Sequence, residues 1–141
     1  MGDIFYNKTV TVYNRYEDDN ENECWIPTVL KNVRLLATKG ANVSKSGMDS
    51  ADAAKLHVKF ELLPEGTKEY IGPKAWKNSS EKEKYFTFSG GEDFFVEGDT
   101  SSEPVQSTNF LSYMQQKYDN CFSVTNVDRY ELIPHLEVGG L

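Results

Sequence analysis

The amino-acid sequence predicts a mainly β protein of the α+β class, a small twisted β-barrel or sandwich of about seven short strands with one late helix. Several short segments alternate apolar and polar residues, which is the pattern of a strand with one buried face. Aromatic residues make up 13% of the 141 residues, and aromatic and β-branched side chains pack well on pleated surfaces. A convincing helical period occurs only once, late in the chain. The length favours a single domain over residues 1–141.

The first predicted strands flank an acidic loop. Valines alternate with polar residues over 9–13, so this segment is expected to be a half-buried strand. Residues 17–23 hold five acids among seven residues and are expected to form a solvated hairpin loop. After this loop, residues 24–26 and 28–38 are expected to be strands bent at Pro27, because proline cannot donate to a sheet ladder.

Two polar stretches are expected to be mobile loops. Residues 39–53 are small and polar with no sustained period, and residues 98–107 are also polar. The first loop has too little apolar area to offset the entropy of ordering, so it is expected to become ordered only against a neighbouring subunit or in a channel. The residues of this loop that are expected to take part in assembly are Lys39, Gly40, Lys45 and Gly47.

The middle of the chain carries the clearest strand pattern. Over residues 56–62, apolar side chains share one face and charged side chains the other. Residues 64–84 are expected to form a short strand and a loop anchored by Trp76. Residues 85–89 and 94–97 are expected to pair as a hairpin around a Ser-Gly-Gly turn.

The last third is expected to hold a helix, a strand and a tail. Apolar residues recur at helical spacing over 108–118, and apolar and polar residues alternate over 121–130. Pro134 separates the tail, residues 131–141, from this strand, which would let the tail add as an extra strand to the sheet of a neighbouring subunit. The residues expected to make this assembly contact are His135, Leu136, Glu137, Val138 and Gly139.

The charge balance restricts the partners. The 22 acidic and 15 basic residues give a net charge of −7, which repels nucleic acid and anionic membranes, so sequence-specific nucleic-acid binding and membrane association are not expected. No stretch approaches the length of a membrane span, and the first residues lack the pattern of a signal peptide. Cys24 and Cys121 are expected to be reduced thiols, with a disulfide as the alternative.

The sequence offers little catalytic chemistry. His57 is expected to be an exposed histidine on the polar face of a strand, and His135 a surface residue or a partner contact. There is no Gly-x-Ser-x-Gly elbow, and neither cysteine has a catalytic context. The acidic run lacks the glycine and the bidentate glutamate of a calcium loop. We therefore expect a non-enzymatic protein without cofactor or metal.

A resemblance to a known class of proteins rests on the order of five segments. They are Thr9-Val-Thr-Val-Tyr-Asn14, Trp25-Ile-Pro-Thr-Val-Leu-Lys-Asn-Val-Arg34, Gly90-Gly-Glu-Asp-Phe-Phe-Val-Glu-Gly98, Ser123-Val-Thr-Asn-Val-Asp128 and His135-Leu-Glu-Val-Gly-Gly140. In this order the chain resembles head-tail connector proteins of tailed bacteriophages and prophages, of the head-completion or minor-capsid type.

The resemblance implies a structural role in the virion. The chain would be a connector subunit that forms a ring beneath the portal, seals the DNA-filled head and presents a surface to the tail. Its partners would be the portal or an adaptor protein, tail proteins and further copies of itself. It would occur in the virion and, during assembly, in the cytoplasm of the bacterial host.

Three other functions remain open at this point, one of them an enzyme, which would need an unrecognised carboxylate pair with perturbed titration in a cleft. A tail-terminator or another tail component belongs to the same broad class, and it would form a stable ring without the portal. A β-barrel module that binds a peptide or an oligosaccharide also fits the aromatic content. Exposed indoles of Trp25 and Trp76 lining one groove would favour that module.

Overall fold

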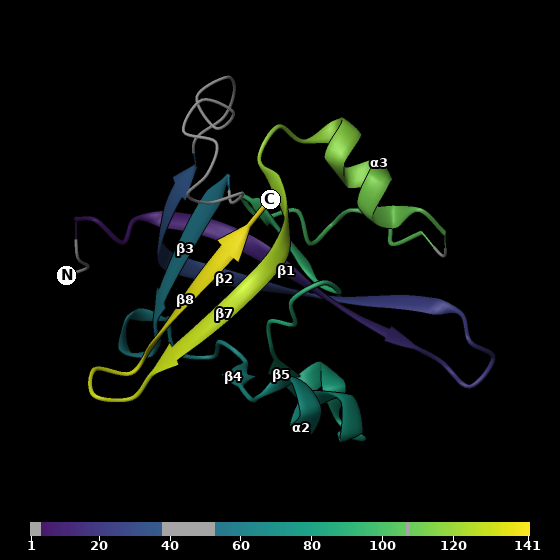
Figure 1. Ribbon diagram of the computed structural model, residues 1–141, viewed down its shortest axis with the longest axis horizontal. Coiled ribbons are helices and arrows are strands. Elements are labelled where there is room, and N and C mark those ends of the chain that lie inside the picture. Colours follow the sequence, from purple (N-terminus) through teal and green to yellow (C-terminus); the bar gives the residue numbers. More distant parts are fainter. Residues whose placement is uncertain (1–3, 38–52, 107) are drawn as a thin grey trace.

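The computed structural model describes residues 4–37, 53–106 and 108–141, and its centre is a closed antiparallel barrel of six strands (Figure 1). Around the barrel the strands are β1 (Lys8–Glu17), β2 (Glu23–Ala37), β3 (Ala54–Lys59), β8 (His135–Gly140), β7 (Cys121–Tyr130) and β6 (Phe94–Glu97), and β6 pairs with β1. The predicted small, mainly β barrel with one late helix is confirmed.

The barrel interior is filled by alternate residues of the strands, because successive side chains of a strand point to opposite faces. The aliphatic part of this core consists of Val10, Val12, Leu30, Val33, Leu56, Val58, Val124, Leu136 and Val138. Rings of Phe86, Phe88, Phe95 and Phe122 complete it. Gly140 lies against two of these rings: a Cβ atom there would be 2.9 Å from Cζ of Phe95 and 2.8 Å from Cβ of Phe122. Glycine therefore fits where a larger residue would displace the core.

The first two strands are longer than the barrel needs. β1 pairs with β6 only over residues 10–13, and β2 pairs with β3 only over residues 34–37. Residues 14–26 therefore form a two-stranded arm that projects beyond the barrel (Figure 1). We refer to these residues as the arm. Pro27 lies within continuous β2, opposite Tyr13, and β2 pairs with no strand on its other edge there, so its missing N–H costs no ladder hydrogen bond.

A second apolar cluster covers the outer side of the barrel at the base of the arm. It consists of Tyr13, Trp25, Phe94, Val96, Phe110, Met114 and Cys121. Phe110 and Met114 come from helix α3 (Phe110–Lys117), which agrees with the helix predicted over 108–118. The Tyr13 ring stacks on Phe94 with 4.8 Å between centroids, and its hydroxyl donates to the Thr100 carbonyl at 2.8 Å.

The segment between β3 and β6 differs from the sequence-based expectation. It contains the 3-10 helix η1 (Phe60–Leu62), strand β4 (Glu69–Tyr70), helix α2 (Pro73–Asn78), the 3-10 helix η2 (Lys82–Lys84) and strand β5 (Tyr85–Phe86). The predicted hairpin of residues 85–89 with 94–97 is wrong, because β5 pairs in parallel with β4 while β6 pairs with β1 and β7. The turn between them is instead held by Asp93, whose carboxylate accepts the Ser89 N–H at 2.7 Å.

The polar stretch 98–107 is tied down at two points. Near its start, the Thr11 hydroxyl donates to the Gly98 carbonyl at 2.8 Å and accepts the Thr100 N–H at 2.9 Å. Further on, the Glu103 carboxylate accepts hydrogen bonds from the hydroxyls of Tyr113 and Tyr118. The contact of Thr11 with residues 98–100 also buries the outer face of β1. The alternation pattern had predicted that this face is exposed to solvent.

The other predicted mobile loop, residues 39–53 with Lys39, Gly40, Lys45 and Gly47, falls almost wholly on residues 38–52, outside the described residues. Within the described ranges, no helix has the length and apolar character needed to cross a bilayer.

Candidate functional site

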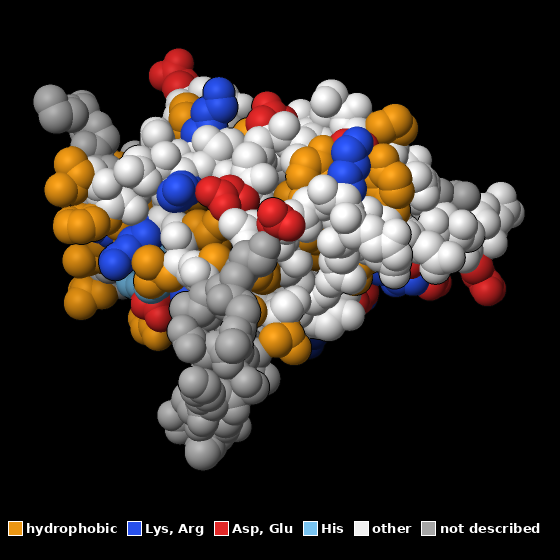
Figure 2. Space-filling view, turned by 90° about the horizontal axis from the view of Figure 1, so that it is seen from above, with side chains coloured by type: hydrophobic (Ala, Val, Ile, Leu, Met, Phe, Trp, Pro, Cys, Tyr) orange, Lys and Arg blue, Asp and Glu red, His pale blue; other side chains and the backbone are white. Residues whose placement is uncertain are grey.

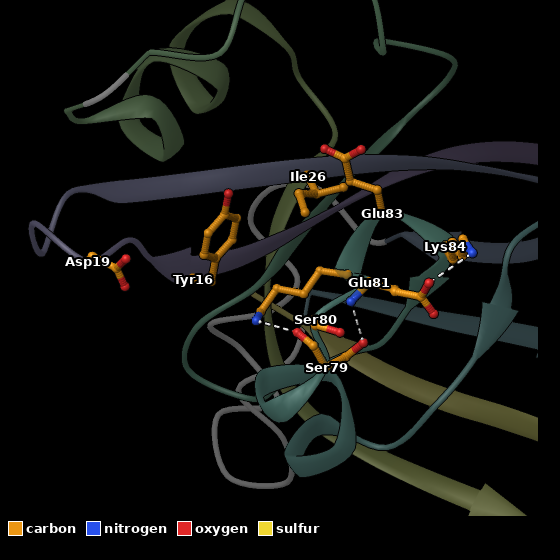
Figure 3. Close-up of a pocket in the computed structure, with 9 residues that line it drawn as sticks. Tyr16, Asp19, Ile26, Ser79, Ser80, Glu81, Glu83 and Lys84 are labelled. Atoms are coloured by element: carbon orange, nitrogen blue, oxygen red, sulfur yellow. Dashed lines mark hydrogen bonds and ion pairs between the residues drawn. The ribbon is translucent and has the colours of Figure 1, made fainter.

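An open groove with a volume of about 740 Å³ lies beneath the arm (Figure 3). The arm supplies Tyr16, Asp19 and Ile26 on one side. The segment that follows α2 supplies the other side, with Ser79, Ser80, Glu81, Lys82, Glu83 and Lys84. The groove thus lies between two elements that are far apart in the sequence.

Trp76 holds the two sides of the groove together. Its indole is buried, and Nε1 donates to the carbonyl oxygens of Lys82 and Tyr85 at 3.3 Å each. The same ring meets Tyr16 edge to face, with 6.1 Å between centroids. Pro73 at the first position of α2 starts this short helix, since proline suits a position whose N–H needs no partner. The prediction that Trp76 anchors this segment matches its place in the structure.

The charges of the groove largely satisfy one another. Lys84 pairs with Glu81 at 3.0 Å, and the Lys82 ammonium donates to the Ser79 carbonyl at 2.9 Å. Lys82 also lies 5.5 Å from the centroid of the Tyr16 ring, and burial raises the pKa of that phenol. The groove therefore offers polar contacts and an aromatic edge to a partner, but no nucleophile beside a base.

A buried polar cluster fixes the arm where it leaves the barrel. The Asp93 carboxylate accepts the Arg15 N–H at 2.9 Å, the Asn14 side-chain amide at 2.9 Å and the Ser89 N–H at 2.7 Å. Asn14 also donates to the Thr87 carbonyl at 2.6 Å. Burial raises the pKa of Asp93 to about 6, although these three donors lower it. Because the Asp93 carboxylate and the Asn14 side-chain amide both have partners, the cluster is a structural clamp.

Metal binding finds no support in the described ranges, where no three His, Cys, Asp or Glu side chains are grouped closely enough to hold an ion.

His57 and His135 both face Glu137: Nδ1 of His57 lies 4.0 Å and Nε2 of His135 lies 3.3 Å from its carboxylate. Burial lowers the pKa of His57. His57 is half-buried, so its predicted full exposure is corrected.

The two cysteines are free thiols in the structure, as expected. Cys24 is half-buried on the arm, whereas Cys121 is buried in the cluster beside α3. Burial raises the pKa of the Cys121 thiol to about 12. Neither thiol has the electropositive surroundings that activate a nucleophile.

The predicted strand-addition contact of the C-terminal tail is wrong for the folded chain. His135, Leu136, Glu137, Val138 and Gly139 all lie in β8, which pairs with β3 on one edge and with β7 on the other. Leu136 and Val138 are fully buried in the barrel core. Because both edges are occupied, this strand cannot also pair with a neighbour. Only the outward side chains of His135 and Glu137 remain available for a partner.

An exposed apolar surface lies at the end of the barrel where β7 turns into β8. Leu132 is 96% exposed and Ile133 58% exposed, and Phe5 of the N-terminal segment is 61% exposed. Figure 2 shows hydrophobic side chains gathered at this left-hand end, beside a histidine. The turn is held in place, since the Phe60 N–H donates to the Pro134 carbonyl at 3.3 Å. In the sequence, the only indication of this surface was the aliphatic pair Leu132 and Ile133 next to Pro134. The pair was not singled out, because the tail was interpreted as a strand that adds to a neighbour.

The indoles of Trp25 and Trp76 do not line a common exposed groove. Trp25 packs in the cluster beside α3, while Trp76 lies under the arm, and both are buried. Trp25 and Trp76 therefore give no support to a module that binds a sugar or a peptide.

Comparison with known proteins gives one match. A family model described as a family of unknown function, DUF6751, matches residues 5–141. No curated protein and no solved structure matches the chain. The match covers every strand of the barrel, both sides of the groove and the apolar end.

Proposed function

The chain belongs to the family of unknown function DUF6751, and we propose that it is a non-enzymatic structural protein of a phage or prophage virion. In this role it is a ring-forming connector or head-completion subunit that joins the portal of the DNA-filled head to the tail. The order of its sequence segments, which resembles that of such connectors, is the starting point of the proposal.

The observation that carries the proposal is the shape of the subunit. One small closed barrel presents two different projecting surfaces, the arm on one side and the exposed apolar end on the other (Figure 1). A subunit of a ring needs two unlike surfaces, because the contact between neighbours is head to tail. Within the barrel, β3, β8 and β7 pair with one another along their lengths, so open strand edges are found chiefly on the arm.

The charge supports a channel role. With a net charge of −7, a ring of such subunits would not retain passing DNA by electrostatic attraction. The groove adds a docking surface of mixed polarity that suits a protein partner better than a small substrate, since it is open and part of its charge is already paired.

A genetic experiment tests this function. Deleting the gene from an inducible prophage that encodes this chain should give DNA-filled heads and tails of normal length that remain unjoined in electron micrographs. Expression of the wild-type chain from a plasmid should restore joined particles. Intact virions without the protein would contradict the proposal.

The second candidate, a tail-terminator, gives different results in the same experiment and in solution. Its loss should produce tail tubes of abnormal length. The purified protein should also form a stable ring, whereas a connector of this charge should be monomeric or weakly associated without a template. Light scattering that shows a stable hexamer or dodecamer at micromolar concentration would favour the tail-terminator.

A further inference from the structure

We propose that the tip of the arm of one copy docks on the outer face of β2 and β3 of the next copy. Exposed acids at the tip would pair there with two outward-facing cations, the exposed Lys55 and the half-buried Arg34. This contact would be the joint between neighbours in the ring, so the proposal rests on the ring-forming role proposed above and specifies its partner as a second copy of this chain.

The tip of the arm is an acidic turn of defined shape. Asp18 Oδ1 accepts the backbone N–H groups of Asn20 and Asn22 at 2.9 Å each, and the Asp18 N–H donates to the Asn22 carbonyl at 3.0 Å. These bonds hold Asp19 and Glu21 on the outside of the turn, where both are exposed. No ion pair between described residues involves Asp19 or Glu21. The tip therefore presents unpaired negative charge on a rigid support.

The outer face of β2 and β3 presents the opposite charge. Arg34 lies opposite His57 and Leu36 lies opposite Lys55 in the ladder, so these side chains point outward together. Neither Arg34 nor Lys55 takes part in an ion pair with another described residue. The face adds apolar area around the cations, through Leu36, which is 45% exposed, and through Phe5, whose ring lies 5.5 Å from the Arg34 guanidinium.

These two charged surfaces cannot meet within one chain. The arm ends at the right-hand side of Figure 1, and β3 with the N-terminal segment lies at the left. A pairing between them must join two copies. Because the two surfaces differ, the contact is heterologous, and repetition of it gives a ring or a filament.

The expected strength of this contact fits assembly on a template. Exposed ion pairs contribute about 0.2–1 kcal/mol each and weaken with salt. A few such pairs give weak association of the free protein. Copies already held side by side by a portal would use the same contacts at a high effective concentration. The joint therefore needs no large apolar interface.

Charge-reversed variants test the proposal. The arm variant carries Asp19→Lys and Glu21→Lys, and the face variant carries Arg34→Glu and Lys55→Glu. The wild type should show concentration-dependent sedimentation at about 20 mM salt that disappears at about 500 mM salt. Each variant alone should sediment as a monomer, because its arm and its face then carry the same sign. An equimolar mixture of the two should associate again, because each arm then meets a face of opposite charge.

Matched controls carry the same change in net charge elsewhere. Glu65→Lys with Glu69→Lys corresponds to the arm variant, and Lys74→Glu with Lys77→Glu corresponds to the face variant. Both control variants should associate like the wild type. Circular dichroism of all four proteins checks that the barrel is folded.

Three outcomes would overturn the proposal. These are a wild type that stays monomeric at low salt, an arm variant that associates like the wild type, and a mixture of the arm and face variants that fails to associate. A different result would assign the face to DNA binding. In that case the face variant would lose binding to a DNA fragment, and the arm variant would still self-associate. Head-tail joining after deletion of the gene is a separate measurement. It tests the connector role, whereas the sedimentation experiments test the contact between the arm and the face.

Discussion

The side chains of Asn14 and Asp93 meet at the point where the arm leaves the barrel, with 2.9 Å between Nδ2 of Asn14 and Oδ2 of Asp93. Both side chains are buried, and 79 residues separate them in the sequence. Asn14 belongs to β1, while Asp93 immediately precedes β6. Their contact fixes the orientation of the arm relative to the barrel, because it binds the first residues of the arm to the turn over residues 89–93.

Replacing Asp93 by asparagine should therefore destabilise the protein by about 2–3 kcal/mol. One oxygen of the carboxylate becomes an amide NH2 group, which cannot accept a hydrogen bond, so at least one of the three N–H donors to Asp93 loses its acceptor. Urea denaturation followed by circular dichroism measures this cost. Glu97→Gln, on the partly exposed end of β6, serves as the control and should cost less than about 1 kcal/mol. An unchanged midpoint for Asp93→Asn would show that the cluster does not hold the arm.

The cost of Asp93→Asn should depend on pH. The unfolded chain loses the Asp93 proton near its ordinary pKa of 3.8, whereas burial keeps the folded pKa at about 6. The folded state binds more protons between these values, so the stability that Asp93 contributes falls as pH rises from about 4 to about 6. The difference in unfolding free energy between wild type and Asp93→Asn should shrink over this range. A difference that grows with pH would mean that the three hydrogen bonds outweigh burial.

Truncation after Pro134 should abolish the fold. It removes β8, empties the core positions of Leu136 and Val138, and opens the edges of β3 and β7. We expect loss of the cooperative thermal transition, measured by circular dichroism. Leu132→Ser, in the exposed turn just before, should leave the transition temperature within about 2 °C of wild type. A truncated chain that still melts cooperatively would contradict the place of β8 in the barrel.

The two cysteines should differ in reactivity. Cys121 is buried, and its thiol pKa is raised to about 12, so almost no thiolate forms at neutral pH. A thiol reagent such as iodoacetamide should modify Cys24 in the native protein and leave Cys121 unmodified until the chain is denatured, as measured by mass spectrometry of peptides. Cys24→Ser should abolish native labelling. Rapid native labelling of Cys121 would indicate that α3 opens readily.

The loop after β6 should loosen when Tyr118 loses its hydroxyl. That hydroxyl donates to Glu103, which also accepts from Lys117 at 2.6 Å. A hydrogen bond to a charged carboxylate contributes about 1.5 kcal/mol or more, so Tyr118→Phe should raise amide hydrogen exchange over residues 99–105 about tenfold. Tyr130→Phe, on the opposite end of the barrel, should leave this exchange unchanged. Equal exchange in both variants would show that Glu103 does not tether the loop.

Local patterns were sufficient to predict several elements. The alternation over residues 121–130 and the helical spacing near residue 110 correspond to β7 and α3 within two residues. The aromatic and β-branched content was enough to predict a mainly β barrel. These properties depend on neighbours along the chain, so they can be recognised without knowledge of the tertiary structure.

Pairing partners were decided by the tertiary structure alone. The segment 135–140 was correctly predicted to be strand-like, yet its place between β3 and β7 depends on residues up to 86 positions away. Pro134 suggested a break from the sheet, but it lies in the turn between β7 and β8, where no ladder N–H is needed. The hairpin predicted at Gly90 is wrong for a similar reason, because two of the three donors to Asp93 lie on the distant strand β1.

The sequence by itself determined that this chain builds a small acidic β domain with a late helix, because composition and periodicity act over a few residues. The tertiary structure decided which residues form the surfaces for partners. The groove joins Tyr16 to Lys82, and the proposed joint between copies needs the arm tip and the outer face of β3 at opposite ends of the molecule. These surfaces arise when the barrel closes, because closure pairs strands that are distant in the sequence and leaves residues 14–26 extending beyond the barrel. Local sequence patterns do not predict this geometry.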